Sequence, residues 1–439
     1  MTLADKVGDL SMLWKQVSLV FPYFDRLGFS WDEVYKTFLS KVLESKTDRE
    51  FHLLLAAFMN RLGDGHTDYL FPKTFQEEVG YLPFTLRQIQ NSYCIDGIIP
   101  EKKAYAALPI TAINGVPFFQ YIQQVKVYAY HVGDSISRYG LHRILPFFLK
   151  KEGNLALTPE GSFSFRLLPV KPENLQPRKL TLPESYEKAE GGKLDIRLYG
   201  GNILYIRMDD FLYSKAADEV EAAIRRNPTI SGVLLDLREN IGGMTRFAAK
   251  VAELFISGEF HACQKRTRTM NGCDLACATQ ILGWREGATE AEITESESYL
   301  NNTHFEHYMD TYGGTHHKAL FTGPCLLLTS RHTVSAAEDF VAMFRTNARA
   351  TILGTPTCGT TGTPLLQSLS CGGSMRVCSV GYQLLDGTEF VGRGIDPDIL
   401  LEGSLTDFRR GYDAVQEKAL AILKKIPCRK SRQGYGVLA

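Results

Sequence analysis

Apolar positions in the first part of the chain recur at the spacing of an α-helix. Six large apolar residues before Gly63 fall on one helical face, and the glycine then ends the repeat. They are Phe51, Leu54, Leu55, Phe58, Met59 and Leu62. The pattern predicts a helical N-terminal region over residues 1–72.

Residues 73–135 change to the alternating pattern that is typical of β-strands. P-F-T-L-R-Q-I-Q-N-S-Y-C-I-D-G indicates two strands around a turn, and L-P-I-T-A-I-N-G-V-P-F a strand followed by an Asn-Gly turn. A short helix is expected at 118–125. This region is therefore predicted to be a small β-rich module. Residues 136–193, which contain several prolines, are predicted to be a variable linker or β segment.

From residue 194 onward, strand-like runs alternate with helix-like runs. Strands are predicted at 203–207, 233–237, 326–329 and 351–353, and helices at 215–226, 244–256, 336–348 and 406–425. The second and third strands are apolar enough to be buried on both faces. This alternation predicts an α/β fold with a mainly parallel sheet over residues 194–439. The glutamate-rich stretch at 284–311 is expected to be a solvated insertion.

Composition narrows the function classes. The chain has 439 residues, 44% hydrophobic and 22% charged, with 49 basic and 49 acidic side chains. A net charge of zero and no basic stripe argue against nucleic acid or an anionic membrane as partner. The nine cysteines are odd in number and irregularly spaced, which favours reduced thiols in a cytosolic protein. No signal peptide and no membrane-spanning run is recognised.

Ser335 is the first candidate for chemistry. It lies in T-V-S-A-A-E-D, between a strand-like run and a helix-like run. Backbone N–H groups converge at such a turn, where the helix dipole is positive, so an oxyanion would be stabilised there. The small residue Ala336 leaves room for a substrate, and its N–H would face the oxyanion. Serine is also a common N-cap, which by itself would be the more ordinary interpretation.

Two further motifs carry matching chemistry. His66 lies in D-G-H-T directly after a predicted helix, and a neutral imidazole can take a proton from a serine hydroxyl. Gly242 and Gly243 follow a buried strand, where paired glycines permit close backbone approach and free N–H groups. A loop histidine and an ordinary tight turn remain the alternatives. Phosphate-binding glycine patterns are missing.

Other polar residues are given less weight. Four histidines flank the acidic insertion, but neither cysteines nor an H-E-x-x-H context supports a metal site, and no cofactor motif is found. They are His304, His307, His316 and His317. Asp236 and Arg238, at a strand end, are expected to form a structural ion pair.

In chain order, these motifs resemble the C-terminal-processing and tricorn-core serine peptidases. The matching pieces are L-G-D-G-H-T, L-Y-I-R-M-D-D-F, G-V-L-L-D-L-R-E-N-I-G-G, T-V-S-A-A-E-D-F, I-L-G-T-P-T-C-G and L-D-G-T-E-F-V-G-R-G-I-D-P-D. I-N-G-V-P-F is similar to the end of the PDZ-like module of such peptidases. The resemblance implies a crotonase-like spiral sheet as catalytic core, with a helical N-terminal region and a PDZ-like insert.

The resemblance also implies roles for single residues. Family members with a Ser-Lys dyad carry the lysine in T-x-G-K-G, where this chain has Thr360, so the tricorn-like Ser-His arrangement is favoured. Ser335 would be the nucleophile and His66 the base, with Gly242 and Ala336 as oxyanion donors and Gly243 as the alternate. The usual carboxylate position is Val391, and Glu389, two residues earlier, is expected to orient His66 instead. Gly65 replaces a serine partner of the histidine, and Asp64 is a weaker orienting candidate.

The predicted function is that of a serine endopeptidase that cleaves peptides or unfolded proteins through an acyl-enzyme. Two alternatives stay open. One is a catalytically silent protein that binds peptides or hydrophobic ligands on the same scaffold, and the other is a dedicated leader-peptide-cleaving protease. The oligomeric state is also open, because members of this family form dimers and larger rings.

Overall fold

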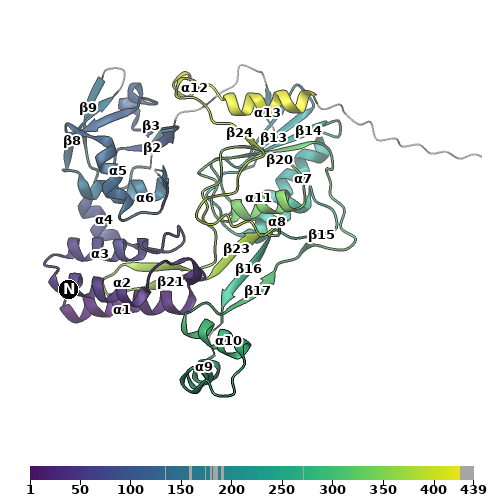
Figure 1. The fold of residues 1–439 in the computed structure, drawn as a ribbon. Helices are drawn as coiled ribbons and strands as arrows, with labels where there is room; N and C mark the ends of the chain where they lie inside the picture. Colours follow the sequence, from purple (N-terminus) through teal and green to yellow (C-terminus); the bar gives the residue numbers. More distant parts are fainter. Residues whose placement is uncertain are drawn as a thin grey trace, which may run out of the picture.

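The computed structural model describes residues 1–133, 135–157, 161–173, 175–177, 180, 186–188, 192–269 and 271–425. The chain begins with three helices that pack beside the core (Figure 1). They are α1 (Leu3–Val20), α2 (Trp31–Glu44) and α3 (Asp48–Asn60). Thr2, Ser30 and Thr47 cap them by accepting a backbone N–H of the first turn. The predicted helical region therefore ends before the loop that carries His66.

After that loop, a short strand ties the N-terminal region to the rest of the chain. Strand β1 (Asp68–Leu70) pairs antiparallel with β22 (Ser374–Cys378), which also pairs with β21 (Pro364–Ser368). Residues more than 300 positions apart are thus hydrogen-bonded neighbours, Asp68 with Arg376 for example. This pairing fixes the end of the His66 loop against the C-terminal half of the chain.

The next region has its own hydrophobic core, separate from that of the main sheet. Helix α4 (Lys73–Val79) leads into it, and most of its strands form two small sheets that pack against α5 (Phe118–Lys126) and α6 (Arg138–Ile144), while β6 (His131–Val132) and β7 (Ser135–Ile136) pair with each other. The strands of the two sheets are β2 (Phe84–Ile89), β3 (Ser92–Ile98), β4 (Ile110–Ile113), β5 (Val116–Pro117), β8 (Glu152–Leu157), β9 (Gly161–Arg166) and β10 (Gln176–Pro177). We call residues 80–167 the module.

The expected boundary of this region at residue 135 needs correction. Strand β8 pairs with both β4 and β9, and Leu155 and Phe165 lie in the same core as Ile113. Much of the segment expected to be a variable linker or β segment therefore forms strands that belong to the module. The alternation of apolar and polar residues in β8 and β9 is short, and the prolines of the segment favoured a linker over strands. Several residues of that segment, Pro159 among them, lie outside the described residues.

The C-terminal half is built on a seven-stranded sheet of order β11-β12-β13-β14-β19-β20-β24. The four predicted strands are present and parallel, with β24 joining them in parallel and β11 and β12 antiparallel. The strands are β11 (Tyr186–Lys188), β12 (Asp195–Tyr199), β13 (Ile203–Arg207), β14 (Gly232–Asp236), β19 (Cys325–Thr329), β20 (Thr351–Gly354) and β24 (Ile399–Leu400).

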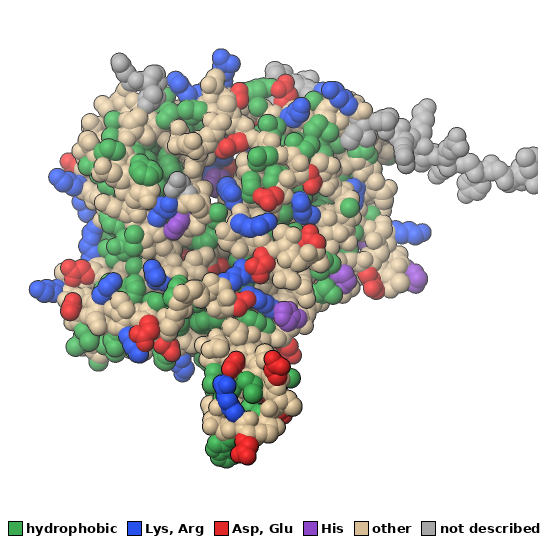
Figure 2. Space-filling model, viewed as in Figure 1, with side chains coloured by type: hydrophobic (Ala, Val, Ile, Leu, Met, Phe, Trp, Pro, Cys, Tyr) green, Lys and Arg blue, Asp and Glu red, His purple; other side chains and the backbone are tan. Residues whose placement is uncertain are grey.

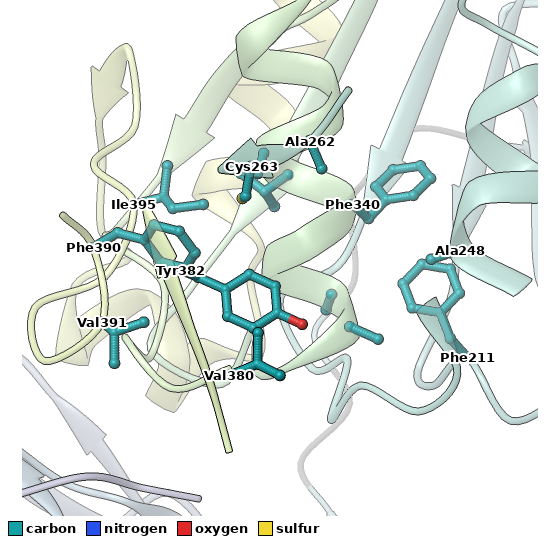
Figure 3. Packing of buried hydrophobic residues seen from close by; sticks show 14 of the residues in the cluster. Phe211, Ala248, Ala262, Cys263, Phe340, Val380, Tyr382, Phe390, Val391 and Ile395 are labelled. Carbon is teal, nitrogen blue, oxygen red and sulfur yellow. The ribbon is translucent and has the colours of Figure 1, made fainter. Parts of the chain in front are cut away.

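Helices cover both faces of this sheet, which explains why its central strands are continuously apolar. Val233 and Leu235 of β14 face the core that contains α7 (Ala216–Arg226), α8 (Thr245–Glu253) and α11 (Ala336–Thr346). Leu234 faces the opposite core, which α13 (Ala414–Lys425) covers. Figure 3 shows the first of these cores, where Phe340 of α11 lies near Phe211. The predicted tail helix is divided into α12 (Leu405–Arg410) and α13.

The glutamate-rich stretch is exposed but also structured. It belongs to a helical hairpin of α9 (Gly272–Trp284) and α10 (Glu290–Leu300), which projects from the body as a separate knob (Figures 1 and 2). The hairpin is carried by the antiparallel strands β16 (Cys263–Arg268) and β17 (Phe305–Met309), and β16 also pairs with β23 (Val380–Leu384). Thr289 and Glu292 form a capping box that starts α10. Among the described helices, none has the length and apolar character needed to cross a bilayer.

Candidate active site

Ser335 stands where the central strand β19 gives way to helix α11. Its backbone has φ 59° and ψ −125°, a left-handed conformation that is strained for a residue with a side chain. The surrounding backbone holds it there, because Ser335 N donates to Thr360 O at 2.9 Å and Val334 N to Asn240 O at 3.0 Å. The preceding Thr333 hydroxyl bonds Leu237 O at 2.9 Å. The strained turn thus presents the serine at the carboxyl edge of the parallel sheet.

His66 is held from both sides of its loop. Its backbone N–H donates to Asp64 Oδ2 at 3.2 Å, and Thr67 Oγ1 bonds the same oxygen at 2.6 Å. From the C-terminal half of the chain, Arg376 donates to Gly65 O at 3.1 Å and Cys378 N to Thr67 Oγ1 at 3.0 Å. This buried, doubly anchored loop carries the imidazole across to Ser335.

The structure brings Ser335 and His66 together, 269 positions apart in sequence, with Nε2 of the imidazole 3.0 Å from Oγ of the serine. His66 is only 6% exposed. Burial, helped by the positive charge of Arg376, lowers the pKa of His66 to about 3, so the ring is neutral at ordinary pH. When its Nδ1 carries the hydrogen, the neutral ring has a lone pair at Nε2 to accept the serine proton.

The partner of His66 Nδ1 is the hydroxyl of Thr360, at 2.6 Å. Thr360 stands where related sequences with a Ser-Lys dyad carry the lysine, and its sequence position predicted no role for it. The structure also explains why Gly65 precedes the histidine. A Cβ at Gly65 would lie 2.5 Å from Thr360 Oγ1 and 2.9 Å from Tyr130 Cδ1. Glycine therefore makes room for the threonine hydroxyl, so two departures from the family pattern meet at one point in space.

Glu338 is a second residue that sequence reasoning missed. It is fully buried and accepts four hydrogen bonds. They come from Thr357 Oγ1 at 2.5 Å, Gly359 N at 2.8 Å, Thr360 N at 2.8 Å and Ser335 N at 3.3 Å. Burial raises the pKa of Glu338 to about 7, against the hydrogen bonds that it accepts. One carboxyl group thus fixes both the turn that carries Ser335 and the turn that carries Thr360.

The expectation that Glu389 orients His66 is corrected. Glu389 forms an ion pair with Arg26 at 2.7 Å, with 47% of its side chain exposed, and Thr360 holds the ring nitrogen that Glu389 was expected to contact. The expectation for Glu389 assumed that this segment is a strand, in which Glu389 and Val391 would face the same side. Residues 388–398 instead form turns and loops. Asp64 contacts the backbone of His66 and not its ring, and burial raises the pKa of Asp64 to about 6.

The glycine turn lies against the other side of Ser335. A Cβ at Gly242 would lie 2.7 Å from Ser335 Cβ and 3.1 Å from Ala336 N. The Gly242 N–H itself is engaged, since it donates to the side chain of Asn240 at 2.9 Å. Within the described part of the chain, the N–H groups of Gly243 and Ala336 have no hydrogen-bond partner. Of the three expected donors, these two are available for an oxyanion.

The remaining candidates lie apart from this pair. Arg238 pairs with Asp236 at 2.6 Å, as expected, and also with Asp413 at 2.8 Å. His304 stacks on Tyr299, and His317 bonds Glu253 O. Over the described ranges, no group of three or more His, Cys, Asp or Glu side chains could hold a metal ion.

A cleft of about 1130 Å³ opens beside the site, between the module and the main sheet. Its lining includes Arg138 and Glu239, which form an ion pair at 2.9 Å, together with His332 and Cys358. Neither Ser335 nor His66 lines it, although His332 is three residues before the serine. Tyr130 stands at its border, where its hydroxyl bonds Gly359 O at 2.9 Å.

Comparisons with known proteins find similarity to serine peptidases. Residues 202–401, which are less than half of the chain, match the model of peptidase family S41. A carboxy-terminal-processing protease of Bartonella bacilliformis is 27% identical over 220 residues, which is 48% of this chain and 42% of the relative. The chain therefore matches less than half the length of this curated relative.

Solved structures resemble the chain over nearly its whole length. Mature CPAF is similar with a TM-score of 0.72 and 14% identity, over 96% of this chain and 97% of CPAF. The photosystem II D1 C-terminal processing protease is similar with a TM-score of 0.50 and 16% identity, over 93% of this chain and 98% of that one. At these identities the likeness shows a shared mixed α/β fold.

Proposed function

We propose that the chain is a serine endopeptidase that cleaves peptide bonds through an acyl-enzyme. Ser335 Oγ attacks the scissile carbonyl carbon while His66 Nε2 accepts the hydroxyl proton. His66 then gives this proton to the leaving amine, and a water molecule hydrolyses the acyl-enzyme by the same route. The single observation that supports this most strongly is the 3.0 Å contact between His66 Nε2 and Ser335 Oγ, a serine within the segment that matches the S41 family model.

Thr360 and Glu338 have positioning roles in this mechanism. Thr360 Oγ1 would accept a hydrogen bond from His66 Nδ1–H. This bond would hold His66 in the tautomer in which Nε2 is the base. Ionised Glu338 accepts the Thr360 N–H and would favour the positive charge that develops on His66. The Gly243 and Ala336 N–H groups would bind the oxyanion, and each such donor is typically worth about 10²–10³ in rate.

The domain layout belongs to the same proposal. We propose residues 194–439 as a crotonase-like spiral core and the module as PDZ-like, supported by its paired strands and separate hydrophobic core. The substrates would be peptides or unfolded proteins, in line with the names of the relatives. A cytoplasmic location and assembly into a homo-oligomer are proposed on the sequence arguments alone.

Digestion of unfolded casein by the purified chain tests this function. We expect the wild type to release peptides and Ser335→Ala to release none, with an unchanged unfolding temperature. An active Ser335→Ala protein would remove the serine from the mechanism. A wild type that binds peptides tightly but releases no fragments would instead support the binding-protein alternative.

A further inference from the structure

Three large apolar side chains are exposed beside the glycine turn. Leu212 is 62% exposed, Ile241 66% and Met244 42%. We call these three residues the apolar rim. Single exposed apolar residues are common on protein surfaces, but neighbouring ones at a functional site indicate a binding surface.

Backbone hydrogen bonds bring the two segments of the rim side by side. Ile241 N donates to Asp209 O at 3.1 Å, Phe211 N to Gly242 O at 2.8 Å, and Met244 N to Phe211 O at 3.0 Å. Gly243 makes this contact close, because a Cβ there would lie 2.6 Å from the Phe211 carbonyl carbon. Leu212 therefore lies next to the turn that bears Ile241 and Met244.

The exposure of the rim does not come from a loose backbone. Phe211, which precedes Leu212, is fully buried and packs its ring 5.4 Å from that of Phe340, as Figure 3 shows from inside the core. Asn240, which precedes Ile241, is also fully buried. Leu212 thus follows a buried residue, and Ile241 lies between two, since Gly242 is also buried, so these two side chains are held outward by anchored neighbours.

The rim is also next to the nucleophile. Gly242 lies between Ile241 and Gly243, and its Cα side faces Ser335 closely enough that a Cβ would overlap Ser335 Cβ. A polypeptide whose carbonyl oxygen reaches the Gly243 N–H would therefore place its neighbouring side chains over the rim.

We infer that the apolar rim is a substrate subsite, and that it selects polypeptides with a large apolar side chain next to the scissile bond. This inference rests on the proposed peptidase function and adds the substrate class to it. Binding an apolar substrate side chain would remove that side chain and the rim from water. Apolar pockets typically discriminate between substrates by about 10- to 200-fold in kcat/KM.

The test compares matched peptides with the variants Ile241→Ser and Met244→Ser. We expect the wild type to cleave peptides with Leu or Phe beside the scissile bond at least about 10-fold faster, in kcat/KM, than peptides with Asp or Lys. Each variant should lose most of this preference through a higher KM. Its labelling by a small fluorophosphonate, which does not need the rim, should stay at the wild-type rate.

Trp284→Ser is the matched control, because Trp284 is 81% exposed on the projecting hairpin, and its preference should equal that of the wild type. Cleavage by the wild type without an apolar preference, or an unchanged preference in both rim variants, would overturn the inference while leaving the peptidase function intact. A wild type that neither labels nor cleaves would overturn the proposed function and the inference with it.

Discussion

The two sides of Ser335 are built in different ways. On the base side, His66, Thr360 and Glu338 are all buried and linked by side-chain and backbone hydrogen bonds. On the glycine side, the Gly243 N–H has no partner in the described chain, and exposed apolar side chains flank it. The base is therefore organised before substrate arrives, whereas the oxyanion site is left open for the substrate to complete.

The largest loss on the base side should follow from Thr360→Val, which keeps the shape of the side chain but removes the partner of His66 Nδ1. We expect kcat to fall about 10²-fold, because the imidazole is no longer fixed in the tautomer and orientation that a general base needs. Thr360→Ser keeps the hydroxyl and should recover most of the rate. Equal rates for the Val and Ser variants would show that the hydroxyl does not orient His66.

An intermediate effect is expected from the protonation of Glu338. Its raised pKa of about 7 means that the carboxyl is ionised above this pH and neutral below it. The rate should therefore fall as the pH decreases through about 7, because a neutral carboxyl no longer favours the imidazolium. His66, with a pKa of about 3, stays neutral over this range and does not cause the fall.

The pH dependence of kcat/KM measures this directly. In Glu338→Gln the acid limb near pH 7 should disappear and the plateau should be lower than that of the wild type. This variant also places an amide against backbone donors, so its unfolding temperature should fall. A wild-type profile that is flat between pH 8 and 5 would contradict the role of Glu338 without relying on the variant.

The smallest decrease in rate should follow from a change on the glycine side of Ser335, at the ion pairs that join this side to the module. Arg87 and Arg138 of the module bond the two oxygens of Glu239 at 2.7 and 2.9 Å. Although burial opposes them, these charges hold the pKa of Glu239 well below its usual range. Glu239 directly precedes Asn240, which bonds Gly242, so this contact reaches the oxyanion turn from the module.

Glu239→Gln should lower kcat severalfold, by less than about 10-fold, because a displaced turn misplaces its N–H donors. Glu389→Gln is the matched control, since it also breaks an arginine pair, but an exposed one outside the site. We expect the control to keep its rate within about twofold of the wild type. If the two variants have equal rates, the module does not act on the glycine turn through Glu239.

Local sequence patterns predict the elements that flank Ser335 and His66. The strand before Ser335, the helix after it and the helix before His66 follow from apolar periodicity, and their motifs suggested the pair. Thr360 could not be assigned, because its contact with His66 spans 294 positions and depends on the space that Gly65 leaves. Glu338 had a readable signal: a glutamate three residues after a serine at a helix start is typical of a capping box.

Glu389 was misassigned for a related reason. The prediction assumed that the segment around Glu389 is a strand. The segment instead forms turns, and the Glu389 carboxylate pairs with Arg26, a residue near the N-terminus. The extent of the module was also missed, because β8 is defined by its pairing with β4, and β9 by its pairing with β8, and not by a strong pattern of their own. Long-range pairing determines both features.

Fluorophosphonate labelling followed by peptide mapping tests the central claim most directly, since only an activated serine reacts quickly. The account predicts one modified residue, Ser335, in the wild-type chain, and a labelling rate that falls by orders of magnitude in His66→Ala. Rapid labelling of Ser335 in folded His66→Ala, or modification of a different residue in the wild type, would contradict it.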